Sequence, residues 1–284
     1  MRVDLIKPIG HCFGVIKAIE LAKQVRRDYP HQHIYVFGFL VHNEDVTREL
    51  YKEGIETIDV SNIDSLKRLR EFDKDDIVIF TAHGHPKIYE GVLNERKIKF
   101  FDASCPKVLK SFELIRNADE VIYIGKMNHP EAMAALTMSD NVHFYDINRG
   151  LDYSKVKSNR PLVLNQTTLS FLELKGIHED IKNHFPEAVI EDEICDATLL
   201  RQKAIMNLDN DIDLVVVVGS KMSSNTNKLY EVAKEANPSK TIIFVENIRD
   251  LEGFSLDFNH SAIIGGTSTP LSVINEIKEY LERL

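Results

Sequence analysis

The segment VDLIKPIGHCFGVIKAIELA, residues 3–22, contains an order of features that recurs twice along the chain. It begins with the apolar run VDLIKPIG, and Cys12 follows this run. After Cys12, the apolar residues Val15, Ile19 and Ala22 recur at the spacing of one helix face. The segment therefore predicts a strand, then a cysteine at its end, then a helix.

The same order surrounds the other two cysteines. Cys105 follows KFFDAS and precedes Pro106, a residue favoured at the start of helices. Cys195 follows AVIEDEI and precedes a helical pattern. The cysteines are 93 and 90 residues apart, which is close to one third of the 284-residue chain. We therefore predict three pseudo-equivalent α/β domains, with the ranges 1–97, 98–190 and 191–284.

Each third also contains further apolar runs that end in polar residues, and a helical pattern follows each of these ends. The rough order β-α-β-α-β-β-α predicts an α/β fold with mostly parallel sheets between helices. Ligands of such sheets bind beyond the carboxyl ends of the strands, so three units can direct these ends at one common centre. The polar residues at the predicted ends are His42, Asn43, His83, His129, Glu131, Thr167, Thr168, Ser223, Ser224, Asn225 and Ser268.

Composition narrows the class of protein. Hydrophobic residues make up 43% and charged residues 28% of the chain, as in ordinary globular proteins. The net charge of −9 argues against nonspecific nucleic-acid binding, which needs clustered Lys and Arg. We expect no membrane span, because the sequence has no apolar run of about 18 residues. The first residues lack the apolar core of a secretory signal, so we expect a cytoplasmic protein.

Three cysteines do not suit a disulfide framework, which uses pairs. Each could be an inert buried thiol, but three at matching strand-to-helix junctions favour a shared role, since a helix N-terminus favours the thiolate. Zinc is one candidate, although structural zinc sites use closely spaced cysteines. An iron–sulfur cluster is the other. A four-iron cluster normally takes four cysteines, so three would leave one iron open to a substrate oxygen.

The polar residues at the strand ends suit an anionic ligand. Histidine N–H groups, and Ser, Thr and Asn side chains next to helix N-termini, can hold a phosphate. The alternative for Ser, Thr and Asn is simple helix capping, and both roles can coexist. Glu131 either complements a helix dipole or moves protons in a closed pocket. The sequence contains neither a Walker A motif nor GxGxxG, so nothing supports an ATP or nicotinamide site.

Nine motifs, in order from residue 1 to about 280, closely resemble one family, the 4-hydroxy-3-methylbut-2-enyl diphosphate reductases. This family catalyses the last step of the methylerythritol phosphate route to isoprenoids. The motifs are GHCFGV at 10–15, VHN at 41–43, TAHG at 81–84, DASCP at 102–106, HPEA at 129–132, NQTTLS at 165–170, ICDATLLRQ at 194–202, SSNTNKL at 223–229 and GGTSTP at 265–270.

The resemblance implies a monomeric trefoil around a central [4Fe-4S] cluster, which can be found as [3Fe-4S] after loss of the open iron. It implies that Cys12, Cys105 and Cys195 are the ligands. It further implies that Glu131 relays protons and that Thr167 positions it. The residues that it implies for the diphosphate are His42, His83, His129, Ser223, Ser224, Asn225 and Ser268.

The implied reaction uses two electrons and two protons to remove the substrate hydroxyl as water, giving isopentenyl and dimethylallyl diphosphate. The implied electron donor is a ferredoxin or a flavodoxin.

Three alternatives stay open at this point. A cluster-dependent hydro-lyase would act without an electron donor, an iron–sulfur sensor would not turn over, and a zinc-binding module would be colourless. None of the three explains the ordered polar set.

Overall fold

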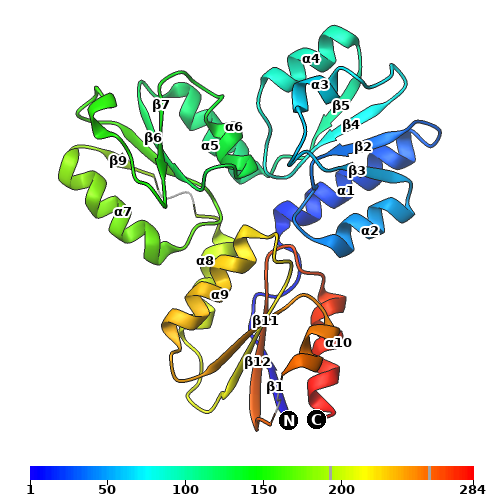
Figure 1. Cartoon of the computed structure of the whole chain (residues 1–284), viewed down its shortest axis with the longest axis vertical. Helices are drawn as coiled ribbons and strands as arrows, with labels where there is room; N and C mark the ends of the chain where they lie inside the picture. The colour runs from blue at the N-terminus through cyan, green and yellow to red at the C-terminus, as the bar shows by residue number, and fades with distance from the viewer. Residues whose placement is uncertain (192–193, 255–256) are drawn as a thin grey trace.

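The computed structural model describes residues 1–191, 194–254 and 257–284. Within these residues the chain forms three lobes around a centre, each built on a four-stranded sheet (Figure 1). Every pairing between neighbouring strands is parallel, and helices pack on the sheets. The predicted trefoil of three α/β units is therefore confirmed.

The first sheet has the strand order β3-β2-β4-β5, and its strands are β2 (Ile34–Phe37), β3 (Ile55–Ile58), β4 (Ile77–Phe80) and β5 (Lys99–Asp102). The second sheet has the order β7-β6-β8-β9, with β6 (Val121–Gly125), β7 (Val142–Asp146), β8 (Leu162–Asn165) and β9 (Val189–Ile190). The third has the order β1-β12-β10-β11, with β1 (Arg2–Leu5), β10 (Leu214–Val218), β11 (Thr241–Val245) and β12 (His260–Gly265).

The helices follow the same threefold pattern. The first unit has α1 (Phe13–Asp28), α2 (Glu44–Lys52), α3 (Ser65–Leu69) and α4 (Ile88–Arg96). The second has α5 (Pro106–Asn117), α6 (Pro130–Ala135), the short η1 (Tyr153–Lys155) and α7 (Phe171–His184). The third has α8 (Asp196–Met206), α9 (Ser224–Ala236), the short η2 (Ile248–Gly253) and α10 (Leu271–Glu282). A short helix thus directly precedes β4, β8 or β12 in each unit, where the sequence pattern predicted none.

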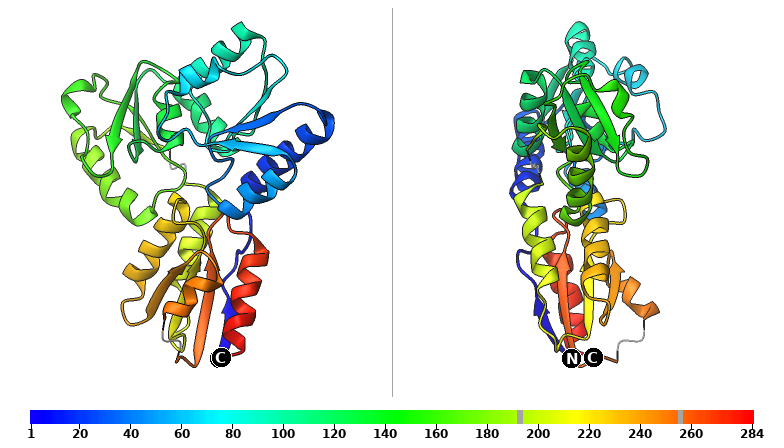
Figure 2. Two further views of the ribbon diagram at one scale, coloured as in Figure 1. Left: turned by 45° about the vertical axis from the view of Figure 1, so that its right-hand side comes forward. Right: turned by 90° about the vertical axis from the view of Figure 1, so that its left-hand side faces the viewer.

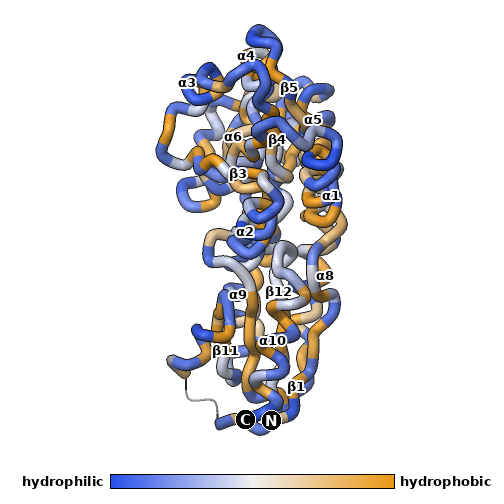
Figure 3. The backbone as a smooth tube through the Cα atoms, turned by 90° about the vertical axis from the view of Figure 1, so that its right-hand side faces the viewer, coloured by the Kyte–Doolittle hydropathy of each residue, from blue (hydrophilic) through white to orange (hydrophobic). Residues whose placement is uncertain are grey.

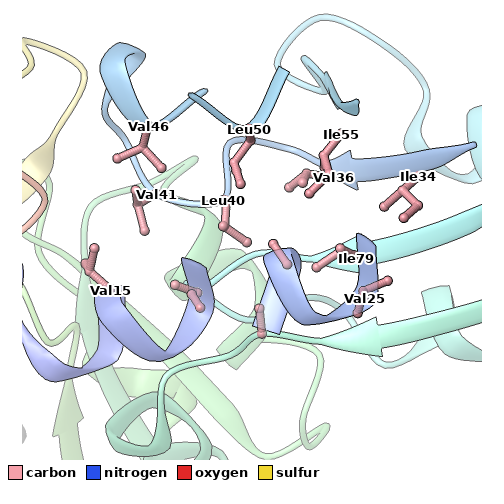
Figure 4. Close-up of a cluster of buried hydrophobic side chains, with 14 of the residues drawn as sticks. Val15, Val25, Ile34, Val36, Leu40, Val41, Val46, Leu50, Ile55 and Ile79 are labelled. Atoms are coloured by element: carbon pink, nitrogen blue, oxygen red, sulfur yellow. The ribbon is translucent and has the colours of Figure 1, made fainter. Parts of the chain in front are cut away.

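The apolar runs become central strands because parallel sheets covered by helices bury both faces of a strand. All five residues of β10, LVVVV, are fully buried. In the first unit, side chains of α1 such as Val15 and Val25 belong to the same buried cluster as Ile34 and Val36 of β2 (Figure 4). The tube coloured by hydropathy shows mostly hydrophilic loops at the outer ends of the units (Figure 3).

Each cysteine lies where the chain passes from one unit to the next. β1 pairs with β12 of the third sheet, but α1 packs in the core of the first unit. In the same way β5 pairs with β4, while α5 packs against β6. β9 pairs with β8, while α8 packs against β10. The chain therefore changes unit three times, each time at a cysteine.

This exchange differs from the predicted ranges in two strands. The range 1–97 puts β1 in the first unit, but β1 joins the third sheet. The range 98–190 puts β5 in the second unit, but β5 joins the first sheet. Both strands are short and contain only two apolar residues each, in RVDL and KFFD, so the local pattern does not decide which sheet they join. The ranges otherwise stay a prediction.

Among the described residues, no helix is both long enough and apolar enough to span a bilayer.

Candidate active site

The three cysteines begin α1, α5 and α8 in equivalent ways. Each has extended backbone at the N-cap position of its helix. The three N–H groups each donate to a carbonyl just beyond β12, β4 or β8, the strand that pairs with the one leading to that cysteine. Cys12 N donates to Thr267 O at 2.9 Å, and Cys105 and Cys195 donate to Ala82 O and Thr167 O, both at 3.0 Å. The end of a strand in one unit thus fixes the position of the cysteine at the start of the next unit.

All three thiols line one cavity at the junction of the units. The space between them depends on Gly14, because a Cβ at this position would lie 2.6 Å from Cys105 Sγ and 4.0 Å from Cys12 Sγ. Burial, and then the neighbouring thiols, raise the pKa of Cys105, and burial and Cys12 raise the pKa of Cys195. Thiols that share one cavity become thiolates together only beside a strongly positive group.

The donor set fits a cluster better than a single zinc ion. Zinc–thiolate bonds of about 2.3 Å in a tetrahedron place the sulfurs about 3.8 Å apart. Among the described residues, the three Sγ atoms do not form a group in which all three lie within 4.8 Å of one another. Their separation is therefore too large for one zinc ion. The chain has three cysteines in all, so a four-iron cluster held here would keep one iron without a cysteine of this chain.

Three histidines meet in the same cavity, one from each of the loops after β2, β4 and β6. The rings of His42 and His83 stack with centroids 4.5 Å apart, and His129 lies edge-on to His83 at 5.7 Å. Three of their ring nitrogens are buried without a hydrogen-bond partner: His42 Nδ1, His83 Nε2 and His129 Nε2. Buried polar atoms of this kind mark the place of a ligand.

A hydrogen bond to His129 decides which kind of ligand the three imidazole rings can bind. One donor atom from each ring lies within 4.8 Å of the others, which also suits a metal ion. However, His129 Nδ1 accepts the N–H of Glu131 at 3.3 Å, capping α6. The proton of a neutral imidazole is then on Nε2, which makes Nε2 a donor to an anion rather than a metal ligand. Burial lowers the pKa of all three histidines, for His129 to about 3, so the free site holds neutral N–H donors.

Glu131 lies in the same cavity at the start of α6, with only 1% of its surface exposed. Thr167 donates to both of its oxygens, through the backbone N–H to Oε1 and through the hydroxyl to Oε2, each at 2.8 Å. Tyr123 of β6 donates its hydroxyl to Oε1 at 3.2 Å. The predicted neighbourhood of Glu131 and Thr167 is therefore present, and the carboxyl group is held in one orientation.

The serines supply donors from the third unit. Ser223 Oγ caps α9 by accepting from Thr226 N. Ser224 Oγ accepts from Thr168 at 3.1 Å and from Gln166 at 3.3 Å, so its own hydroxyl proton is directed elsewhere. Ser268 Oγ donates to His42 O at 3.3 Å, a contact between the third and first units.

Asn225 lies in the cavity and also has both ends of its side-chain amide hydrogen-bonded within the protein. Its Oδ1 accepts from Thr267 N and its Nδ2 donates to Thr198 Oγ1, both at 2.9 Å. The side chain therefore ties α9 to α8 and to the loop after β12, and one amide proton remains for a ligand. All twelve site residues that the sequence predicted line this cavity: Cys12, His42, His83, Cys105, His129, Glu131, Thr167, Cys195, Ser223, Ser224, Asn225 and Ser268.

Sequence reasoning missed the residues that hold this set in place. Gln166 is fully buried and links Ser224 to the backbone of Lys126, accepting from Lys126 N at 3.1 Å. Arg201, 2% exposed, donates to Gly10 O and Gly265 O, joining the loops next to Cys12 and after β12. The motifs NQTTLS and ICDATLLRQ contain both residues, but only the fold shows what they contact.

A model of the LytB protein family matches residues 3–282, almost the whole chain. The chain belongs to the LytB family. The predicted family is therefore confirmed, and the match covers all three units and every residue of the cavity.

Relatives in the LytB family are similar over the full length of the chain. The 4-hydroxy-3-methylbut-2-enyl diphosphate reductase of Bacillus subtilis is 36% identical over 293 residues, covering 100% of this chain and 91% of that protein. The reductase of Malacoplasma penetrans is 33% identical, covering 100% of this chain and 98% of that protein. The solved structure of the Plasmodium falciparum enzyme has 28% identity and a TM-score of 0.85, covering 100% of this chain and 87% of that one.

Proposed function

We propose that this LytB-family protein reduces (E)-4-hydroxy-3-methylbut-2-enyl diphosphate to isopentenyl and dimethylallyl diphosphate. One observation carries the proposal. A single cavity is lined by three equivalent thiols, a buried carboxyl group and unpartnered imidazole nitrogens. Thiols, a proton carrier and phosphate donors are the three kinds of group that this reaction needs.

The diphosphate would lie among His42, His83 and His129 and the hydroxyls of Ser223, Ser224 and Ser268. These donors come from all three units, and the N-termini of α2, α6 and α9 add partial positive charge. The protein carries a net charge of −9, so affinity for a strongly anionic ligand has to come from these local donors. The diphosphate would anchor the allylic end of the substrate next to the thiols.

Cys12, Cys105 and Cys195 would hold a [4Fe-4S] cluster, which supplies electrons and a Lewis-acidic iron when bound. Glu131 would hold a proton at Oε1 or Oε2 and deliver it to the substrate. Thr167 keeps both oxygens oriented through its two hydrogen bonds, so the carboxyl group cannot rotate away from the substrate. The buried histidines and apolar walls exclude bulk water from the reacting carbon.

The proposal includes the ligation by three thiols and the roles of the individual side chains. It also includes a monomeric state and a one-electron carrier, such as a ferredoxin or flavodoxin, as the electron donor. The cytoplasmic location stays a prediction from the sequence.

Turnover under reducing conditions tests the function directly. Protein purified without oxygen would be assayed with the allylic diphosphate and dithionite-reduced methyl viologen. We expect two viologen electrons consumed for each product molecule, and both isomeric diphosphates among the products. Consumption of substrate without viologen oxidation would instead identify a hydro-lyase. If the iron-loaded protein consumes no substrate, the proposed enzymatic function is rejected and an iron–sulfur sensor becomes the better interpretation.

A further inference from the structure

Large apolar side chains are exposed directly after each of the three cysteines. Phe13 and Ile16 of α1 are 73% and 43% exposed, Leu109 of α5 is 42% exposed, and Leu200 of α8 is 55% exposed. All four lie within five residues after Cys12, Cys105 or Cys195, that is, within about 8 Å along a helix axis. Single exposed apolar residues are ordinary, but a group around one buried centre marks an interaction surface.

The three helices lie on the same face of the molecule. Figure 3 shows α1, α5 and α8 along one side of the flattened molecule and α2 and α9 along the other. The edge-on view in Figure 2 shows the same arrangement from the opposite side. Each helix buries its other side, through residues such as Val15, Val108 and Ile205, so the exposed residues point away from the sheets.

Basic residues outnumber acidic ones around these apolar side chains, although the whole protein is acidic, and the exposed acidic residues on the same helices include Glu20, Glu113 and Asp196. Lys17 of α1, Lys110 of α5 and Lys203 of α8 are exposed near the apolar residues, and Lys7 is exposed in the loop before Cys12. The first turns of α1 and α5 contain no acidic residue, and that of α8 contains only Asp196. An apolar patch with a positive rim fits a partner whose own surface is negative.

The patch also lies on the opposite side from the substrate donors. Ser223 and Ser224 begin α9 and Asn43 begins α2, and both helices are on the other face. A protein docked on α1, α5 and α8 would therefore come close to the three thiols without covering the diphosphate site. We name the group Phe13, Ile16, Lys17, Leu109, Leu200 and Lys203 the thiol face.

We propose that the thiol face is the docking surface for an acidic one-electron carrier protein. This inference rests on the proposed function. Two reduced carriers, docking one after the other, each give up one electron and leave oxidised. With two protons, these two electrons convert the substrate alcohol into the hydrocarbon and water. The contact would be small and short-lived, as electron-transfer encounters are.

Charge reversal on the two faces tests the docking surface. The variant Lys17→Glu/Lys203→Glu changes the thiol face, and Lys52→Glu/Lys234→Glu makes the same change on α2 and α9. The probe is an acidic plant-type [2Fe-2S] ferredoxin. We expect the thiol-face variant to lower ferredoxin-driven kcat/KM at low salt at least tenfold and to flatten its salt dependence, because charges at the rim of an interface mainly set the association rate. The control variant should change it less than twofold.

Two further measurements separate this inference from the proposed function. Turnover with dithionite-reduced methyl viologen should be unchanged in both variants, since neither touches the cavity. Binding of oxidised ferredoxin to the cluster-loaded protein, measured by surface plasmon resonance, needs no turnover at all. Weaker binding to the thiol-face variant alone supports the docking surface even if the substrate were different. Equal effects of both variants, or no effect of the first, would overturn it.

Discussion

His129 combines two roles that belong to different atoms of its ring. Nδ1 caps α6, and Nε2 points without a partner into the cavity. Asparagine also caps helices well, so His129→Asn keeps the cap of α6 and removes only the Nε2 donor in the cavity. Loss of one hydrogen bond to a charged group costs about 1.5–3 kcal/mol, so we expect KM for the diphosphate to rise about 10- to 100-fold. Steady-state kinetics measure this.

The matched control is His129→Ala, which loses both roles. It should show the same rise in KM and, in addition, a melting temperature lower than that of His129→Asn, because the cap is gone. An unchanged KM in the asparagine variant would contradict the assignment of Nε2 to the diphosphate.

Glu131 is held by two donors from Thr167, and glutamine offers only one oxygen to them. Because the amide also carries no exchangeable carboxyl proton, we expect Glu131→Gln to lower kcat about 10²- to 10⁴-fold, the usual contribution of general acid catalysis. Iron content and the dissociation constant for the diphosphate should change little. Single-turnover kinetics with isothermal titration calorimetry test both, and a kcat near that of the unaltered protein would reject the proton role.

At this scale the sequence identified residues by their place at strand ends. His42, His83 and Ser223 each follow an apolar run, and parallel strands bring such ends together. Gln166 and Tyr123 were not identified for a physical reason. Gln166 acts on Ser224, 58 residues further on, and Tyr123 acts from within a strand that reads as core. The first contact exists only once two units are assembled, and the second only once α6 packs on β6.

Among the secondary-structure elements, the first turn of α1 controls the space for the metal centre. A Cβ on Gly14 would lie 2.6 Å from Cys105 Sγ, and a sulfur bound to iron cannot move aside. We expect Gly14→Ala to fold with unchanged helical content but to retain less than half of the normal iron and sulfide. Colorimetric iron and sulfide analysis after anaerobic reconstitution measures this.

Gly91 in α4 provides the matched control, because nothing lies within 4 Å of a Cβ placed there. Gly91→Ala should retain full iron and gain up to about 1 kcal/mol of stability from helix propensity. Equal iron content in the two variants would show that the first turn of α1 does not limit the site.

The order of strands and helices could be read from the sequence, because period and cysteine position are local signals. The partner of β1 could not, since β1 pairs with β12 about 258 residues later, through the register Arg2 to His260. A four-residue strand such as RVDL carries no local signal of which sheet it joins. The short helices before β4, β8 and β12 were missed because they interrupt no apolar period.

For the whole molecule, the proposed donors for the diphosphate come from three separate lobes. The contacts between units next to them include Ser268 to His42 O and Thr168 to Ser224. A ligand that bonds to all three lobes should draw them together, because each lobe gains contacts only in the closed arrangement. We expect the radius of gyration from small-angle X-ray scattering to decrease when the diphosphate is added. Identical scattering curves with and without it would contradict this closure.

We propose that sulfurs from three junctions hold one cluster with a single iron that lacks a protein ligand. Mössbauer spectroscopy of protein reconstituted with ⁵⁷Fe and sulfide, recorded with and without the allylic diphosphate, tests this ligation. We expect four irons, of which one differs from the other three and alone changes its spectrum when the substrate binds. Four equivalent irons that ignore the substrate, or a protein that takes up zinc and no sulfide, would contradict it.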